Sequence, residues 1–393
     1  MFRIQTINKI AAEGLNLFSR DRYEAASEFL NPDAILVRSA SLHGAALSKS
    51  VLAIARAGAG VNNIPVDYCS ENGIVVFNTP GANANAVKEM VLASLFLASR
   101  KIMDSAAWVK SLANEPYADG DFEKLIEKSK SLYGGPEIYG KTLGVVGLGA
   151  IGVMVANDAL SLGMNVMGYD PYISVDAAWK LSRNVQKAES LEAMLDKSDY
   201  VTIHVPYSET TKSLLNYERI HEMKKGARLI NFARSGLVDE DGVIHALDRG
   251  RLALYVTDFP SYKLLKHEKI ICTPHLGAST PEAEINCAVM AAKQLMDFLE
   301  TGVVRNSVNF PRCTLQEQKN YRLIVVNRNI PNMVGQITTA IASRGVNITD
   351  LVNHHQGNYA YNIIDAEQKL PDDVLDNLRK INGIIRVRTI DKK

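Results

Sequence analysis

Short apolar runs alternate with helix-like stretches in the first part of the chain. The runs AILVRS (34–39), VLAIARAG (51–58) and IVVFNT (74–79) are typical of buried strands. Strands that alternate with helices predict a parallel sheet wrapped by helices. Residues 84–100 are then rich in helix formers and nearly apolar on every side. This pattern predicts a long helix buried between two bodies, which could serve as a hinge.

A second series of strands begins at Thr142, after residues 113–140, which are polar and contain Gly and Pro. It ends near residues 271–277, ICTPHLG. Helical lengths separate its strands, as a doubly wound sheet requires. The strand candidates are LGVVGLG (143–149), NVMGYD (165–170), YVTIHV (200–205), RLINFA (228–233) and LALYVTD (252–258).

The last part of the chain predicts a third body. A long amphipathic helix runs to a plausible stop at Gly302, and residues 307–319 look like a linker. Beyond it the pattern is strand, helix, two strands, helix and strand, which is the βαββαβ order of a small ferredoxin-like domain. The fold class is therefore α/β, with two doubly wound Rossmann- or flavodoxin-like domains and this third domain.

Composition supports a globular protein of two or three domains, since 393 residues exceed the usual size of one hydrophobic core. Hydrophobic residues make up 47% and charged residues 22%, which argues against disorder and coiled coil. A net charge of +1 gives no support to nucleic acid or a membrane surface as the main partner. We therefore expect any anion-binding site to depend on a few nearby cationic side chains rather than on the net charge of the protein.

The four cysteines are widely scattered, and they predict neither a disulfide framework nor a metal site. The first residues lack the apolar stretch of a signal peptide, and the best apolar run, residues 90–98, is too short to span a bilayer. These features predict a soluble, cytoplasmic protein.

The segment VVGLGAIG has the spacing of a dinucleotide-binding turn, because glycines at 147, 149 and 152 follow a strand and open a helix. Ala150 and Ile151 would begin that helix. Asp170 ends the next strand, near the distance expected for the acid that holds a ribose hydroxyl. A carboxylate at that position repels a 2′-phosphate, so the predicted cofactor is NAD.

Three further stretches resemble the D-2-hydroxyacid dehydrogenase family: RAGAGVNNI (56–64), INFARSGLVDE (230–240) and TPHLGAST (273–280). Within the family, the chain looks most like the branch that acts on 3-phosphoglycerate, and its last part is similar to ACT domains, which bind amino acids. The resemblance implies a nucleotide domain inserted within a discontinuous substrate domain, with the substrate in the cleft between them. The implied domains are substrate-binding 1–93 and 276–306, NAD-binding 94–275, linker 307–319 and ACT regulatory 320–393.

The same resemblance implies the catalytic set. Arg234 matches the residue that holds the substrate carboxylate, for which a planar guanidinium is suited. His275 matches the acid/base, and an imidazole can exchange protons near neutral pH. Both follow strands, at the sheet ends where doubly wound folds bind ligands. Pro206 and the backbone near Ala233 match positions that line the nicotinamide pocket.

The segment VTDFPSYKLL departs from the family pattern, which places a glutamate before the histidine. Asp258 matches the family's aspartate near the nicotinamide, but the register of the glutamate falls on Lys263, or on Tyr262 or Glu268 if the loop shifts. Lys263 is therefore a candidate substitute acid/base, and a solvated loop lysine is the equal alternative.

A phosphorylated substrate needs further cations, and Arg38 and Arg56 are candidates because the resembling fold places them at strand ends facing the cleft. Ala59 and Gly60 are small enough to let backbone N–H groups approach a carboxylate. In the last domain, Asn329 and Asn347 match asparagines that hold serine in serine-regulated relatives. Asn327 replaces a histidine of those relatives, and turn formation is the alternative role for both asparagines.

The resemblance also implies a homodimer or homotetramer. Three other functions stay open: a reductase for hydroxypyruvate, glyoxylate or another 2-keto acid, an NAD-sensing corepressor-like binding protein, and an amino-acid sensor that works through the last domain.

Overall fold

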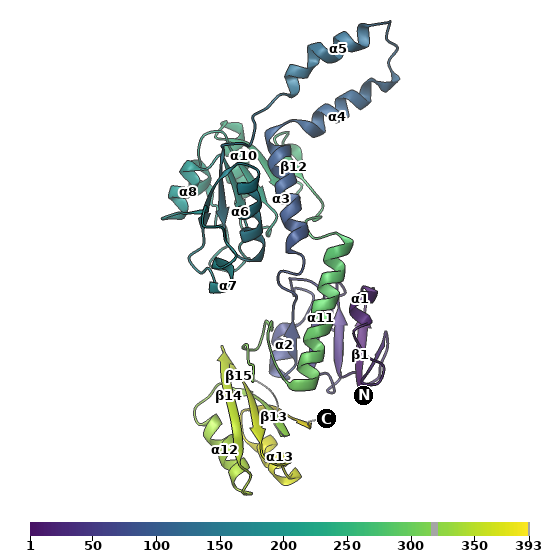
Figure 1. Ribbon diagram of the computed structural model, residues 1–393, viewed down its shortest axis with the longest axis vertical. Helices are drawn as coiled ribbons and strands as arrows, with labels where there is room; N and C mark the ends of the chain where they lie inside the picture. The colour runs from purple at the N-terminus through teal and green to yellow at the C-terminus, as the bar shows by residue number, and fades with distance from the viewer. Residues whose placement is uncertain (316–320, 392–393) are drawn as a thin grey trace. The chain divides into compact units, whose positions relative to one another are not determined.

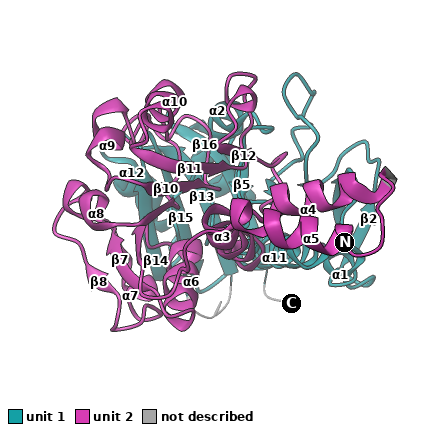
Figure 2. Cartoon of the chain, turned by 90° about the horizontal axis from the view of Figure 1, so that it is seen from above, with its two compact units in different colours: residues 1–83, 281–393 teal, residues 84–280 magenta. Residues whose placement is uncertain are grey.

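The computed structural model describes residues 1–315 and 321–391. The described chain divides into two compact units, residues 1–83 with 281–393 and residues 84–280 (Figure 2). The class is α/β with parallel sheets, as the strand patterns predicted, and a separate antiparallel sheet follows near the C-terminus (Figure 1).

The N-terminal sheet belongs to the first unit and has the order β2-β1-β3-β4-β5, with every neighbouring pair parallel. This is the flavodoxin-like order of doubly wound sheets. Every residue of β3 is buried, which explains why its sequence is apolar without alternation. The elements are β1 (Phe2–Ile7), α1 (Ala12–Leu15), β2 (Tyr23–Ala26), β3 (Ala34–Val37), β4 (Ala53–Arg56), α2 (Val66–Glu71), β5 (Val75–Phe77) and α11 (Pro281–Thr301).

The second unit contains a seven-stranded parallel sheet of order β12-β11-β10-β9-β6-β7-β8. The order reverses between β6 and β9, and ligands of doubly wound sheets bind at that switch. Its strands are β6 (Thr142–Val146), β7 (Asn165–Tyr169), β8 (Gln186–Lys187), β9 (Tyr200–Ile203), β10 (Ala227–Asn231), β11 (Leu252–Thr257) and β12 (Ile270–Cys272). Its helices beside the sheet are α3 (Ala84–Ser99), α6 (Ala150–Ser161), α7 (Val175–Ala178), α8 (Leu191–Lys197), α9 (Tyr217–Glu222), α10 (Glu240–Asp248) and the 3₁₀ turn η3 (Leu264–Lys266).

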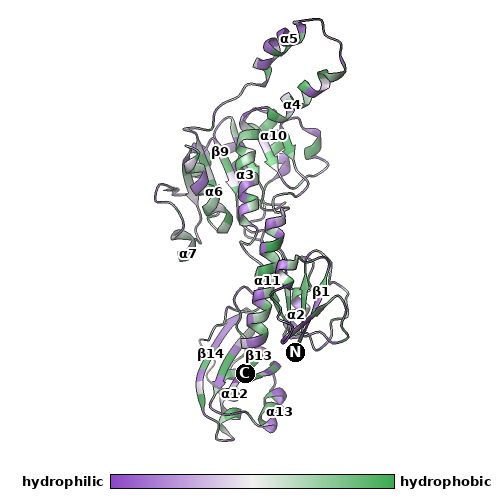
Figure 3. Cartoon of the chain, turned by 45° about the vertical axis from the view of Figure 1, so that its right-hand side comes forward, coloured by the Kyte–Doolittle hydropathy of each residue, from purple (hydrophilic) through white to green (hydrophobic). Residues whose placement is uncertain are grey.

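Two helices extend from the second unit as an arm between α3 and β6 (Figure 1). They are α4 (Ile102–Ser111) and α5 (Asp121–Ser129), each followed by a 3₁₀ turn, η1 (Leu112–Asn114) and η2 (Lys130–Tyr133). Neither helix has a buried residue, although both carry hydrophobic side chains (Figure 3). Residues 113–140 looked polar in sequence, but acidic residues in the first turn of α5 and Lys128 in its last turn favour a helix there.

The C-terminal sheet has the order β14-β15-β13-β16 and is antiparallel. With its two helices it has the predicted βαββαβ order and the strand arrangement of a ferredoxin-like fold. Its elements are β13 (Tyr321–Arg328), α12 (Met333–Ala342), β14 (Ile348–Gln356), β15 (Tyr359–Ala366), α13 (Asp372–Lys380) and β16 (Ile384–Asp391).

The C-terminal sheet packs on the N-terminal sheet and α11 through one shared hydrophobic core. Ile324, Val326, Tyr361 and Ile363 of this sheet join the same cluster as Phe298 of α11. The alternate residues on the same strands pack under α12 and α13 instead. Both faces of the C-terminal sheet are therefore covered within the first unit.

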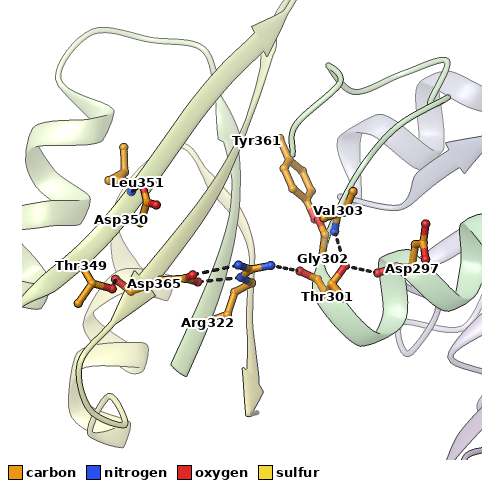
Figure 4. Close-up of polar contacts among 10 residues, drawn as sticks. All are labelled: Asp297, Thr301, Gly302, Val303, Arg322, Thr349, Asp350, Leu351, Tyr361 and Asp365. Atoms are coloured by element: carbon orange, nitrogen blue, oxygen red, sulfur yellow. Dashed lines mark hydrogen bonds and ion pairs between the residues drawn. The ribbon is translucent and has the colours of Figure 1, made fainter. Parts of the chain in front are cut away.

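Side chains of the C-terminal sheet also bind the last carbonyl groups of α11 (Figure 4). Arg322 donates to the carbonyl of Thr301 at 3.0 Å, and the Tyr361 hydroxyl donates to the carbonyl of Gly302 at 2.8 Å. Arg388 donates to the carbonyls of Phe298 and Leu299. The end of α11 is the negative end of the helix dipole, which the cationic side chains of Arg322 and Arg388 stabilise.

The segment 307–315 was predicted as the first part of a linker, and it packs closely in the structure. Phe310 is fully buried. The Asn309 side chain accepts from the backbone N–H of Val76 and donates to the carbonyl of Ile74. The rest of the predicted linker, residues 316–319, lies outside the described residues, as does position 320.

No helix within residues 1–315 and 321–391 is both long and apolar enough to cross a membrane.

We predict that Asp365→Ala strongly destabilises the first unit. Arg322 and Asp365 form a bidentate ion pair at 2.7 and 2.9 Å, and each side chain is 1% exposed (Figure 4). Removing one partner of such a buried pair costs about 3–5 kcal/mol, which urea denaturation would measure. Asp376→Ala, which removes the exposed pair with Arg379, is the control and should cost about 0–1 kcal/mol. Equal losses in the two variants would contradict the prediction.

Candidate active site

Three glycines shape the turn between β6 and α6, and each has a distinct physical reason. Gly147 has a φ of +90°, and a Cβ there would lie 2.8 Å from Val205. A Cβ on Gly152 would lie 1.9 Å from the carbonyl oxygen of Gly147, so this glycine permits close helix packing. A Cβ on Gly149 would meet nothing within 4 Å, which leaves the backbone there open. The loop therefore fits a pyrophosphate at the N-terminus of the twelve-residue helix α6, which begins with Ala150 and Ile151.

Asp170 follows β7 and its carboxylate holds the same loop. It accepts from the backbone N–H of Leu148 and of Tyr172, both at 2.8 Å. Each carboxylate oxygen can accept more than one hydrogen bond, so these contacts leave capacity for a ribose hydroxyl. The geometry fits the residues expected to hold NAD.

A half-buried histidine, His204, lies beside this loop just after β9. Desolvation lowers the pKa of His204 to about 3, so its ring is neutral. Thr202 contacts its Nε2 at 3.0 Å. Pro206 follows two residues later, and its carbonyl accepts from the hydroxyl of Thr211 at 2.7 Å.

The residues after β10, β11 and β12 are joined by backbone hydrogen bonds at one edge of the sheet. The N–H of Asp258 donates to the carbonyl of Asn231 at 3.1 Å, and the N–H of His275 donates to the carbonyl of Asp258 at 3.1 Å. Arg234 lies three residues beyond Asn231. The structure thus brings the two predicted catalytic residues to the same edge of the sheet. They follow β10 and β12, and one strand, β11, lies between these two.

The loop that carries His275 is organised by the buried carboxylate of Asp258, which is 1% exposed. Asp258 Oδ1 accepts from the Thr273 hydroxyl at 2.6 Å and from the Leu276 N–H at 2.7 Å, while Oδ2 accepts from the Gly277 N–H at 2.7 Å. We therefore find Asp258 bound to the histidine loop, whereas the sequence pattern assigned it to the nicotinamide. Either role leaves the carboxylate at the sheet edge beside His275.

His275 has a φ of +56°, a conformation that non-glycine residues seldom adopt. Its side chain is exposed, and its ring packs edge-on against Phe259 with 5.0 Å between ring centroids. Such strain persists where surrounding hydrogen bonds hold the backbone, and it is common at functional sites.

Arg234 is exposed, and hydrogen bonds to the backbone hold it in place. The Asn231 side chain donates to the carbonyl of Arg234 at 2.9 Å and accepts from the N–H of Ala233 at 3.1 Å. Arg234 Nη1 donates to the carbonyl of Ala233 at 2.7 Å. Among the described residues no carboxylate forms an ion pair with Arg234, so its remaining donors can face an anionic ligand.

Lys263 lies just before the turn η3, and the structure pairs it with Asp241 of α10. Its side chain is 48% exposed. Ser261, two residues before, donates to Glu240 at 2.8 Å. These contacts attach the loop to the start of α10, and the role of Lys263 as an acid/base stays a prediction.

Arg38 and Arg56 lie together in the first unit, because β3 and β4 are neighbours and Val37 pairs with Arg56. Arg38 forms an ion pair with Glu284 of α11 at 2.6 Å, and this hydrogen bond lowers the pKa of Glu284. Arg56 donates to the carbonyls of Arg38 and Gly60 at 2.9 and 2.5 Å.

The backbone beside these arginines is also tightly held. The Asn78 side chain donates to the carbonyl of Ala59 at 2.7 Å, and the N–H of Thr79 donates to the carbonyl of Gly58 at 3.1 Å. The backbone after β4 is therefore fixed in place, whereas Arg38 is paired to a carboxylate that is itself 43% exposed.

The two candidate effector residues are exposed and make contacts inside the C-terminal sheet's own domain. Asn329 donates to the carbonyl of Gly357 at 3.3 Å, and Asn347 donates to Glu367 at 2.9 Å. Asn327 is buried and receives a bond from Asn362 at 2.7 Å. An effector at these asparagines stays a prediction.

Sequence reasoning missed three residues that support the site: Asn231, Thr273 and Glu284. The first two lie within the quoted motifs INFARSG and TPHLG, so their polar side chains near Arg234 and His275 were the available signal. Glu284 is 246 residues from Arg38, and nothing local in the sequence pairs them. Within the described part of the chain, no group of three or more His, Cys, Asp or Glu residues could hold a metal ion.

We predict that Asp258→Asn loosens the His275 loop. Asparagine has one acceptor oxygen where the carboxylate has two, so the N–H of Leu276 or of Gly277 loses its partner, at a cost of about 1–3 kcal/mol. Hydrogen exchange of peptides that cover residues 273–280 should become faster. Asp248→Asn, at an exposed carboxylate, is the control. Unchanged exchange in Asp258→Asn would refute the role that we assign to this carboxylate.

Comparison with known proteins places this geometry in a family. The model of the D-isomer specific 2-hydroxyacid dehydrogenase NAD-binding domain matches residues 92–277. The D-3-phosphoglycerate dehydrogenase of Bacillus subtilis is 34% identical over 335 residues, which are 81% of this chain and 61% of the relative. The chain therefore spans about three fifths of that relative's length. The enzyme of the same name from Haemophilus influenzae is 32% identical over 84% of this chain and 79% of its own length.

A solved structure agrees with these relatives. The NAD⁺-bound 3-phosphoglycerate dehydrogenase of Entamoeba histolytica superposes with a TM-score of 0.61 and 27% identity, over 78% of this chain and 98% of its own. The matched domain contains the glycine turn, Asp170, Arg234 and His275 described above. The chain belongs to the D-isomer specific 2-hydroxyacid dehydrogenase family, and residues 92–277 are its NAD-binding domain.

Proposed function

We propose that the chain catalyses the NAD-dependent oxidation of 3-phospho-D-glycerate to 3-phosphohydroxypyruvate, the first step of L-serine biosynthesis. The observation that carries the proposal is the identity of 32–34% to relatives named D-3-phosphoglycerate dehydrogenase over more than four fifths of the chain. Arg234 and His275 are exposed at one edge of the sheet, which supports catalysis rather than NAD binding alone. The four cysteines are free thiols, which fits work in the reducing cytoplasm.

Arg234 binds the substrate carboxylate in this proposal. Its guanidinium keeps two nitrogens free of the bond to Ala233, and a planar fork can pair with both oxygens of a carboxylate. The bonds from Asn231 and to Ala233 hold its backbone at the end of β10. The substrate is thus oriented before any bond is broken.

His275 acts as the acid/base. Its imidazole takes the proton of the C2 hydroxyl during oxidation and returns it in the reverse reaction. Bound NAD supplies the acceptor for the hydride that leaves C2. The three hydrogen bonds to Asp258 fix the backbone of the loop, which lowers the entropy cost of positioning His275. Lys263 is a secondary candidate for moving the proton.

Arg38 and Arg56 are the proposed clamp for the substrate phosphate, with the backbone at Ala59 and Gly60 beside them. Arginine is suited to phosphate because its fork donates two hydrogen bonds. Glu284 forms an ion pair with Arg38 in this structure, so a phosphate that binds Arg38 would compete with that carboxylate.

We further propose a homodimer or homotetramer that binds an amino-acid effector, such as serine, near Asn329 and Asn347 of an ACT-type C-terminal domain. The arm supports association, because α4 and α5 have ten and nine residues and bury none of them. Isolated helices of that length are marginal in water and need packing for stability. A second copy of the chain would supply that packing.

We predict that His275→Asn lowers turnover at least about 10²-fold, as loss of a general acid/base does. Asparagine is chosen because it tolerates the positive φ of this position. Oxidation of NADH by 3-phosphohydroxypyruvate, followed by absorbance, measures the effect. His267→Asn, which replaces a histidine paired with Asp248, should retain turnover. Near-normal turnover in His275→Asn would exclude the proposed acid/base.

The wild-type protein in the same assay tests the function itself. A 2-keto acid reductase would prefer glyoxylate or hydroxypyruvate, and a nucleotide sensor would bind NADH without turnover. Either result would overturn the assignment to 3-phosphoglycerate.

We predict that Arg38→Met raises the KM for 3-phosphohydroxypyruvate by about 10-fold or more, since a charged hydrogen bond contributes roughly 1.5–3 kcal/mol. The KM for hydroxypyruvate, which lacks the phosphate, should change little. Arg22→Met, which breaks the ion pair with Glu300, is the matched control. An equal loss for both substrates would remove Arg38 from the phosphate clamp.

A further inference from the structure

Three cationic residues lie at one edge of the N-terminal sheet. The strands β1, β3 and β4 are parallel neighbours, with Ile7 paired to Val37 and Val37 paired to Arg56. Arg38 directly follows β3, and Lys9 lies two residues beyond β1. Because the carboxyl ends of parallel strands meet at one edge of a sheet, Lys9 lies at the same edge as the two arginines.

The turn after β1 is bound to the loop after β3. Asn8 has a φ of +72°, a conformation that non-glycine residues seldom adopt. Its side-chain oxygen accepts from the backbone N–H of Ser39 at 3.2 Å and of Ala40 at 2.5 Å. These bonds hold the backbone of Lys9 close to that of Arg38. The side chain of Lys9 is exposed, so its ammonium group can approach a ligand.

A carboxylate shares this edge with the cations. Glu284, in the first turn of α11, accepts from Arg38 Nη2 at 2.6 Å. The hydrogen bond from Arg38 lowers the pKa of Glu284, and the charges of Arg38 and Lys9 lower it further, so Glu284 is ionised at neutral pH. Among Lys9, Arg38, Arg56 and Glu284, the positive charge exceeds the negative charge by two.

The ion pair between Arg38 and Glu284 can exchange with a ligand. The two side chains are 37% and 43% exposed, and exposed ion pairs are weak because water solvates both partners. A phosphate monoester carries a charge of about −1.5 to −2 near neutral pH and has three acceptor oxygens. It therefore matches the excess positive charge of the four groups, and it offers more acceptors than the single carboxylate that it would replace.

We propose that Lys9 is a third cation of the phosphate site and that Glu284 is the counter-ion that the phosphate displaces from Arg38. This inference rests on the proposed function, because it adds two specificity-determining residues to the clamp formed by Arg38 and Arg56. Glu284 holds the Arg38 side chain while no phosphate is bound, and it weakens phosphate binding because its ion pair must break first. Lys9 strengthens phosphate binding through its charge.

Binding of inorganic phosphate to the full chain tests the proposal without turnover. The melting temperature is measured against phosphate concentration at low, constant ionic strength, and its rise gives the Kd. Glu284→Gln should lower the Kd about 2–5-fold, and Lys9→Met should raise it about 2–5-fold, as expected for single exposed charges. An unchanged Kd in either variant would overturn the role of that residue.

Matched variants control for the general effect of charge. Glu282→Gln removes an exposed carboxylate from the same first turn of α11, and Lys369→Met removes an exposed lysine of the same unit. Both should keep the Kd of the wild-type protein. Equal shifts in Glu282→Gln and Glu284→Gln would overturn the counter-ion role. An unchanged Kd in Arg38→Met would show that phosphate binds elsewhere, and would overturn the whole site.

Kinetics separate this inference from the proposed function. The ratio of the KM for 3-phosphohydroxypyruvate to the KM for hydroxypyruvate should fall in Glu284→Gln and rise in Lys9→Met. A wild-type protein that does not reduce 3-phosphohydroxypyruvate, but whose variants shift the phosphate Kd as expected, would refute the proposed function and support the anion site. Normal turnover with an unchanged Kd and KM ratio in both variants would refute the anion site alone.

Discussion

The catalytic edge of the second unit depends on one buried carboxylate. Asp258 is almost fully shielded from water, and burying such a group is costly unless hydrogen bonds replace hydration. Three donors from the loop 273–277 supply those bonds. The same bonds hold His275 in a backbone conformation that it would not adopt alone. The hydrogen bonds that stabilise the buried charge of Asp258 are therefore the same bonds that hold His275 in its strained conformation.

Local patterns predicted much of this edge. The carboxyl ends of parallel strands meet at one side of a sheet, so finding Arg234 and His275 directly after strands was enough to place them together. The glycine spacing was equally informative, because Gly147 and Gly152 meet steric demands that another residue would violate, and Gly149 leaves the backbone open. Turn and strand chemistry of this kind is encoded within a few residues.

Contacts between distant parts of the chain could not be predicted in the same way. Arg322 pairs with Asp365 across two antiparallel strands, and Glu284 reaches Arg38 from another element. The segment 307–315 resembled a linker because its composition is mixed, yet Phe310 is buried in the shared core. The helix α5 was missed because charges at its two ends favour it, and it contains no long apolar run. Tertiary packing decides such cases.

The helix α11 has a consequence of its own. It is one continuous helix of 21 residues, so it is about 30 Å long and stiff. Glu284 in its first turn forms an ion pair with Arg38. At the other end, Arg322 and Arg388 of the C-terminal sheet bind the last carbonyls of the helix, and the Tyr361 hydroxyl binds the carbonyl of Gly302, the next residue. The C-terminal sheet and Arg38 are thus bound to opposite ends of one stiff helix, so the C-terminal domain helps to fix the position of a residue beside β3.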